Sequence, residues 1–215
     1  MSVEDIRKND YKLSLNSYIA STTPDSWARL GGTDGVCDIL IGGTPSTKEP
    51  LYWHNGKNLW VTITDMTSEY IVDTGRKITD AGVVNSSVKQ LDKGTVLLSF
   101  KLSVGKVGIA GAKLFTNEAI AGLVPREKDT VYPKYLYHLL SRMDLTSGIQ
   151  DAAKGKTLNK DSLENIRIPL PSYQEQKQIV AKLEAIKEQR EALQHKLNEL
   201  RQAADNIIAE YTKAV

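Results

Sequence analysis

The apolar positions near the C-terminal end of the chain repeat with alternating spacings of four and three residues. Ten positions follow this spacing: Ile179, Leu183, Ile186, Arg190, Leu193, Leu197, Leu200, Ala204, Ile207 and Tyr211. All of them except Arg190 are apolar. A period of 3.5 residues keeps apolar side chains in one line only when the helix winds around another helix. A helix lying on its own domain would show a wider, less regular stripe. The pattern therefore predicts a coiled-coil helix over 173–215, roughly 60 Å long, and a second helix that covers its stripe.

Between residues 29 and 172, short apolar runs alternate with turn residues. β-Branched and apolar residues bounded by Asn or Gly favour strands, and such runs occupy 58–64, 94–100 and 104–110. Residues 132–141 favour a helix that has Pro133 near its start. The expected fold class is α+β: a mixed α/β domain over 29–172, then the long C-terminal helix. Residues 1–28 are polar and form a separate N-terminal arm in this interpretation.

Composition excludes several protein classes. With 40% hydrophobic and 25% charged residues, the chain resembles a soluble globular protein, not a disordered or collagen-like one. A single cysteine, Cys37, excludes a disulfide framework and a cysteine-based zinc site, and it favours a reducing compartment. We find no transmembrane-length apolar run and no export-signal pattern, so the expected location is the cytoplasm.

The net charge of +2 conceals an uneven distribution of charged residues. Residues 93–160 carry 11 basic and 5 acidic side chains, a balance of +6, whereas residues 1–92 have a balance of −3 and residues 161–215 one of −1. A local basic excess is typical of a surface that contacts the phosphate backbone of nucleic acid. An uneven solvated surface would show the same pattern, so both interpretations stay open.

A search for catalytic residues finds little. The chain has no Walker A loop, no G-x-S-x-G elbow and no H-E-x-x-H pair. It also lacks the Asn/Asp-Pro-Pro-aromatic signature of adenine-N6 methyltransferases and a Pro-Asp…Glu-x-Lys nuclease cluster. Its histidines, His54, His138 and His195, are far apart in the sequence. We therefore expect no catalytic residue, no cofactor and no metal site, and a chain that is not an enzyme by itself.

Several short strings occur in a fixed order along the chain. They are Gly42-Gly43-Thr44-Pro45-Ser46, Leu59–Met66, Gly94–Ser99, Ser103–Lys106, Asn117–Ala119, Ala121–Pro125 and Ile166–Gln176 (IRIPLPSYQEQ). Each string alone is weak, but the ordered set resembles a target recognition domain and conserved helical region of a Type I restriction–modification specificity subunit. The resemblance covers about residues 30–215.

The resemblance implies sequence-specific recognition of double-stranded DNA without catalysis. In that family, separate modification and restriction subunits methylate and cleave the DNA. The usual specificity subunit alternates two recognition domains with two helical regions, and this chain resembles half of one. Residues 6–19 resemble the C-terminal tail of modification subunits, so the recognition part of a fused methyltransferase–specificity enzyme is an alternative. A coiled-coil DNA-binding regulator with no methyltransferase partner is another.

Candidate DNA contacts lie near the family strings. Lysines on loops neutralise phosphates without reading sequence, and the candidates are Lys101, Lys106, Lys154, Lys156 and Lys160. Side chains with hydrogen-bonding groups read base edges, and the candidates are Thr62, Thr64, Ser99, Ser103, Asn117 and Asn159. Local capping and turn formation explain each of these polar residues equally well.

The resemblance also implies how the C-terminal helix pairs. The two helical regions of the family's usual subunit pack antiparallel and hold the recognition domains apart. A chain with one of each regains that arrangement by pairing with a copy of itself. We therefore expect a homodimer through the seam residues Ile179, Leu183, Ile186, Arg190, Leu193, Leu197, Leu200 and Ile207. Its two-fold axis predicts an interrupted palindrome as the DNA target.

Overall fold

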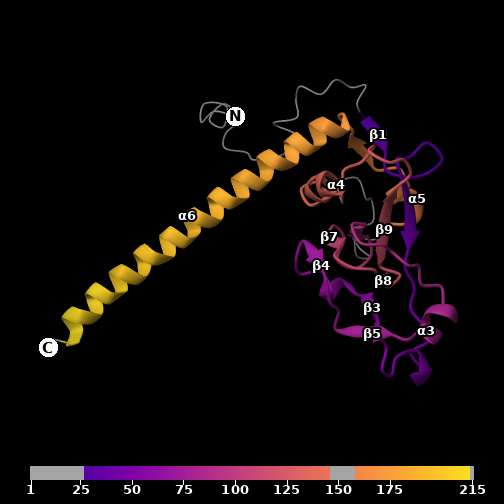
Figure 1. Cartoon of the computed structure of the whole chain (residues 1–215), viewed down its shortest axis with the longest axis horizontal. Coiled ribbons are helices and arrows are strands. Elements are labelled where there is room, and N and C mark those ends of the chain that lie inside the picture. The colour runs from indigo at the N-terminus through magenta and orange to yellow at the C-terminus, as the bar shows by residue number, and fades with distance from the viewer. Residues whose placement is uncertain (1–26, 146–157, 214–215) are drawn as a thin grey trace, which may run out of the picture. The chain divides into compact units, whose positions relative to one another are not determined.

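The computed structural model describes residues 27–145 and 158–213. The chain divides into two compact units after Gln176: a mixed α/β unit, which we call the recognition domain, and a helical unit that begins at Lys177 (Figure 1). The N-terminal arm, apart from its last two residues, lies outside the described residues. Those two residues, Trp27 and Ala28, begin strand β1, which ends at Arg29.

A five-stranded sheet forms the centre of the recognition domain. Its strands lie in the order β2 (Cys37–Ile41), β9 (Ile120–Pro125), β6 (Val96–Ser99), β7 (Val107–Ala110) and β4 (Tyr70–Ile71). All neighbours are antiparallel except β4 and β7. All four residues of β6 are buried, because this strand lies in the middle of the sheet with both faces covered. Gly122 is needed opposite it, since a Cβ there would lie 2.5 Å from the Leu91 side chain.

In a smaller, three-stranded sheet the strand order is β5 (Arg76–Ile78), β3 (Asn58–Val61) and β8 (Phe115–Thr116). Strand β3 is antiparallel to β5 and parallel to β8. The short helices η2 (Pro50–Tyr52) and α3 (Asp80–Val84) contact each other beside this sheet (Figure 1). Its core contains Trp60, Ile78, Val88 and Phe115. The Trp60 indole N–H donates to the Gly43 carbonyl at 2.9 Å, which joins the smaller sheet to the loop after β2.

A two-stranded ribbon joins the two ends of the recognition domain. In it, β1 (Trp27–Arg29) pairs antiparallel with β10 (Arg167–Pro169). Helix α5 (Lys160–Glu164) precedes β10, and helix α4 (Pro133–Leu140) packs against β7. The buried Tyr135 hydroxyl of α4 donates to the Pro169 carbonyl at 2.9 Å, and burial raises the pKa of Tyr135 to about 12.

The long helix α6 (Tyr173–Lys213) begins with a well-defined cap. The Glu175 N–H donates to the Ser172 hydroxyl at 3.3 Å, and the Ser172 N–H donates to the Glu175 carboxylate at 2.9 Å, so the two residues form a capping box. The buried Gln176 side chain accepts from the Tyr132 N–H at 2.8 Å and donates to the Pro171 carbonyl at 2.9 Å. These contacts give a physical reason for the Glu175-Gln176 pair in the first turn of α6, at the end of the string Ile166–Gln176.

The structure confirms the α+β fold class, with mixed sheets and a long C-terminal helix. Helix α4 with its early proline also matches the expectation for 132–141. The strand expected over 58–64 was wrong at its end, because β3 stops at Val61 and residues 63–65 form a 3₁₀ turn, η3. The strands expected over 94–100 and 104–110 are shorter, since residues 100–106 form the turn between β6 and β7. None of the described helices is long and apolar enough to cross a membrane.

Candidate nucleic-acid interface

Five segments from different parts of the recognition domain meet at one end of its sheets. They are residues 42–46, 62–66, 99–106, 116–119 and 158–160, and we call them together the loop face. Strand register places them there: the end of β2 is paired with the start of β9, and the end of β6 is also paired with the start of β9. The parallel pair β3 and β8 ends at the same level, where Val61 lies opposite Thr116.

Backbone hydrogen bonds connect three of these segments. The Gly43 N–H donates to the Thr116 carbonyl at 2.9 Å, and the Asn117 N–H donates to the Val61 carbonyl at 3.0 Å. Gly42 permits this close approach, because a Cβ there would lie 2.2 Å from the Thr116 carbonyl oxygen. The string that begins with Gly42-Gly43 therefore packs directly against the segment that contains Asn117.

Phe100 connects the remaining segments. Its N–H donates to the Ala119 carbonyl at 3.0 Å, and its carbonyl accepts from the Leu158 N–H at 2.8 Å. The Lys106 ammonium donates to the Ile63 carbonyl at 3.2 Å. Segments that lie as far apart in the sequence as Gly43 and Thr116 are thus held together by direct contacts.

The predicted base-reading residues Thr62 and Thr64 lie in the turn after β3. The Thr62 hydroxyl donates to the Asp65 carboxylate at 2.6 Å, and the Gly75 N–H donates to the same side chain at 2.9 Å. Burial alone would raise the pKa of Asp65, but hydrogen bonds from Gly75 and Thr62 outweigh it and lower the pKa. Thr62 and Asp65 therefore hold the turn, and Thr64 is exposed on it.

Ser99 and Ser103 have different environments in the turn between β6 and β7. Ser99 is completely buried. Its hydroxyl donates to the Ser103 carbonyl and accepts from the Lys106 N–H at 2.9 Å. Ser99 is therefore inaccessible to a ligand and instead shapes the turn, whereas the Ser103 side chain is exposed.

The two candidate asparagines also make local bonds. The Asn117 side-chain oxygen accepts from the Ala119 N–H at 3.1 Å, and Asn159 caps α5 by accepting from the Ser162 N–H at 2.7 Å. Lys160, which follows Asn159, lies 3.5 Å from Glu164 in an ion pair within α5. Each of these asparagines still has its amide N–H groups for a ligand.

Two lysines of the loop face keep their positive charge available. Neither Lys101 nor Lys106 forms an ion pair with a carboxylate of the described residues. The Lys101 ammonium lies 5.3 Å from the centre of the Phe100 ring. Lys154 and Lys156 lie outside the described residues.

Sequence reasoning missed three residues of the loop face. Thr44 donates its hydroxyl to the Glu118 carboxylate. This hydrogen bond is the main reason that the pKa of Glu118 is lowered, and the nearby charge of Lys101 adds to it. The third residue, Leu102, is exposed at the tip of the turn between β6 and β7. Its neighbours were recognised because they are charged or polar, but a lone leucine carries no such signal.

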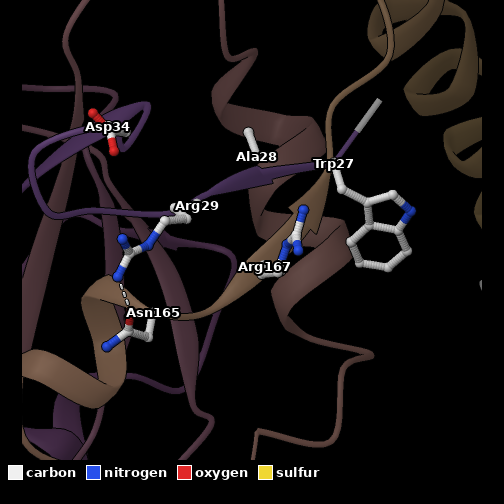
Figure 2. Close-up of a pocket in the computed structure, with 6 residues that line it drawn as sticks. All are labelled: Trp27, Ala28, Arg29, Asp34, Asn165 and Arg167. Carbon is white, nitrogen blue, oxygen red and sulfur yellow. Dashed lines mark hydrogen bonds between the residues drawn. The ribbon is translucent and has the colours of Figure 1, made fainter. Parts of the chain in front are cut away.

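A second basic surface lies at the β1–β10 ribbon. An open pocket of about 540 Å³ is lined there by Trp27, Ala28, Arg29, Asp34, Asn165 and Arg167. Figure 2 shows Arg29 directed toward Asn165, to which it donates a hydrogen bond, and Arg167 on the neighbouring strand. The two arginines are cross-strand partners, which concentrates positive charge. Because the pocket adjoins the C-terminal end of α5 whereas Asn159 caps its N-terminal end, this surface is distinct from the loop face.

The residues that the structure describes include no group of three His, Cys, Asp or Glu side chains placed to hold a metal ion. Cys37 is buried, and this burial raises its pKa to about 12, with the charge of Asp38 acting in the same direction. A thiol with such a pKa is a poor nucleophile at neutral pH.

Solved structures share this architecture. A chain from a structure on complex assembly and conformational transition of the type I R-M system matches with a TM-score of 0.62 and 25% identity, over 87% of this chain and 44% of that one. The HsdS subunit from Thermoanaerobacter tengcongensis matches in fold with a TM-score of 0.59 and 23% identity, over 90% of this chain and 48% of its own. This chain therefore shares its fold with an HsdS subunit and with a chain from a type I R-M structure.

The family follows from the sequence match. The family model of the Type I restriction modification DNA specificity domain covers residues 30–202, and the chain belongs to this family. It is 36% identical to the MjaIX specificity subunit of Methanocaldococcus jannaschii over 69% of this chain and 35% of that protein. It is 28% identical to the EcoR124I/EcoR124II specificity subunit of Escherichia coli, over 82% and 44% respectively. The chain thus spans less than half the length of these relatives.

Proposed function

We propose that this chain recognises a specific sequence in double-stranded DNA and directs partner subunits of a Type I restriction–modification system to it in the cytoplasm. A modification subunit would methylate the site and a restriction subunit would cleave DNA, while this chain supplies no catalytic residue. The observation that carries the proposal is the loop face. It gathers segments from across the domain around two lysines, Lys101 and Lys106, that form no ion pair with a carboxylate of the described residues.

In this proposal, the residues of the loop face have different tasks. Lys101, Lys106 and Lys160 contact phosphates, as do Lys154 and Lys156, and set the position of the DNA without reading its sequence. Thr64, Ser103, Asn117 and Asn159 offer hydrogen-bonding groups to base edges. Thr62 and Ser99 act indirectly, because their hydroxyls are engaged in holding the two turns.

We propose further that helix α6 pairs antiparallel with α6 of a second copy. In the described structure the seam side chains of its outer half are exposed, with Leu193 71% and Leu200 59% accessible. A two-fold axis near His195 places Leu193 against Leu197 of the second copy. The same register places the polar seam residue Arg190 near Glu199 of that copy, and a polar seam residue often fixes register. The two recognition domains would then read an interrupted palindrome.

Charge reversal on the loop face tests DNA binding. We expect the double variant Lys101→Glu/Lys106→Glu to bind a fluorescent random-sequence duplex at least about tenfold more weakly at low salt, because each lost phosphate contact removes counterion release. The dependence of affinity on salt concentration should also become less steep, by about one in slope for each lysine. Fluorescence anisotropy over a series of salt concentrations measures both.

The matched control is Lys93→Glu/Lys128→Glu. Lys93 precedes β6 and Lys128 follows β9, so both lie at the opposite end of the same sheet. This variant has the same net charge and should bind almost as the parent does. Equal binding by the loop-face variant and the parent would contradict the proposal.

The partner subunits need a separate experiment. Co-expression with the modification subunit of the host should give a complex that co-purifies, and sequencing of methylated bases should reveal one methylated motif in the host DNA. Deletion of this chain should abolish methylation of that motif. Methylation that persists without the chain would contradict its role as the specificity component.

A further inference from the structure

Leu102 has a backbone conformation that leucine rarely adopts. Three non-glycine residues of the described part of the chain have positive φ angles: Asn55, Leu102 and Asp129. Asn and Asp tolerate this region because their short side chains bond the local backbone, but leucine does not. At φ 63°, Leu102 is strained, and such strain persists only where the surrounding structure imposes it.

Hydrogen bonds to Ser99 fix the conformation of the turn around Leu102. The buried Ser99 hydroxyl donates a hydrogen bond to the Ser103 carbonyl and accepts one from the Lys106 N–H. The Gly105 N–H also donates to the Ser99 carbonyl at 3.0 Å, with Gly105 itself at φ 93°. The turn is therefore ordered before any ligand arrives, which reduces the entropy lost on binding.

At the tip of this ordered turn, the Leu102 side chain is 84% exposed, the highest value among the exposed large hydrophobic residues of the described chain. It contributes almost nothing to the core, so stability does not explain it. Lys101 precedes it directly, and Lys106 stands at the other side of the turn. An apolar side chain on a rigid, lysine-flanked turn has the form of a wedge that enters DNA between two base pairs.

We propose that Leu102 inserts between adjacent base pairs of bound DNA from the minor groove and unstacks them, while Lys101 and Lys106 contact the phosphates on either side. The inference rests on the DNA-binding function proposed above. Insertion of an apolar side chain separates a base step and kinks the duplex. Recognition would then depend on how easily that step deforms, at a position where no hydrogen bond reads the base.

A duplex with one mismatched pair tests the wedge, because its bases are already partly unstacked. The full-length parent should bind this duplex about tenfold more tightly than the fully paired one, since part of the unstacking free energy is already spent. Leu102→Ala keeps the turn but removes the wedge, and it should bind both duplexes equally. Leu102→Gly should also lose the preference and should unfold at a higher temperature, because glycine relieves the strain at positive φ.

Val72→Ala is the matched control. Val72 is an exposed apolar residue, 67% accessible, that follows β4 at the opposite end of the central sheet. This variant should keep the preference for the mismatched duplex. The inference is overturned if the parent binds both duplexes equally or if Leu102→Ala keeps the preference; DNA binding that still depends on Lys101 and Lys106 would then leave the proposed function standing. A parent that binds neither duplex overturns both.

Discussion

Leucine side chains are buried in the core of the recognition domain and exposed on the outer half of helix α6. Leu97, in the central strand β6, is completely buried. Leu197, on α6, is 42% exposed, and Leu193, one turn earlier, is 71% exposed. The recognition domain obtains its stability from its own core, whereas an isolated α6 leaves its apolar stripe in water. The two parts therefore differ: the recognition domain has an internal core, whereas α6 exposes an apolar stripe that the second helix proposed above would cover.

The largest effect is expected on self-association through helix α6. Leu193→Glu/Leu197→Glu should abolish self-association of the chain over micromolar concentrations, because it removes seam contacts and brings unpaired charges together in a coiled coil. Light scattering coupled to size-exclusion chromatography measures the mass of the parent and the variant.

The matched control for that variant is Asn198→Glu/Gln202→Glu, which adds the same charge with the same four-residue spacing away from the seam. It should keep the parent's mass. A parent that is monomeric at high micromolar concentration would contradict homodimer formation through α6, although DNA recognition by the domain would be unaffected.

A leucine-to-alanine substitution in each part tests whether the recognition domain and α6 are stabilised independently. Leu97→Ala should lower the free energy of unfolding of the recognition domain by about 2–5 kcal/mol, because it leaves a cavity in a core that cannot close over it. Leu197→Ala should leave that unfolding transition within about 0.5 kcal/mol of the parent. Chemical denaturation followed by tryptophan fluorescence reports on the domain, since Trp27, Trp53 and Trp60 all lie within it. A Leu197→Ala variant whose domain unfolds as early as that of Leu97→Ala would contradict the independence of the two parts.

A smaller effect on domain stability is expected at the turn after β3, which Asp65 holds through its hydrogen bonds. Asp65→Ala should destabilise the domain by about 1 kcal/mol at neutral pH, because it removes hydrogen bonds to a partly exposed carboxylate. The pKa of Asp65 is lowered in the folded state from its ordinary 3.8, so the stabilisation is present above that pH and disappears as the pH falls further. Thermal unfolding of both proteins as a function of pH should therefore show a difference that shrinks below pH 3.8. A difference that is constant down to lower pH would show that the charge of Asp65 has no part in it.

Local patterns in the sequence predicted the regular elements because each pattern is a property of neighbouring residues. The heptad spacing from Ile179 onward predicted α6, and Pro133 predicted the start of α4. The same reasoning extended β3 too far, because Thr64 has the β-branched side chain typical of a strand. Asp65 ended the strand instead, through bonds to Thr62 and to the distant Gly75.

The sequence by itself thus determined the fold class, the long helix with its apolar stripe and the ordered strings that mark the family. The tertiary structure decided which strings meet, because the register of β9 against β2 and β6 sets which loops share one end of the sheets. It also decided that Ser99 is buried beneath a turn while Leu102 is exposed at its tip. Burial depends on contacts between residues far apart in the chain, and the backbone strain at Leu102 depends on the hydrogen bonds that close its turn, so the pattern of apolar and polar residues encodes neither.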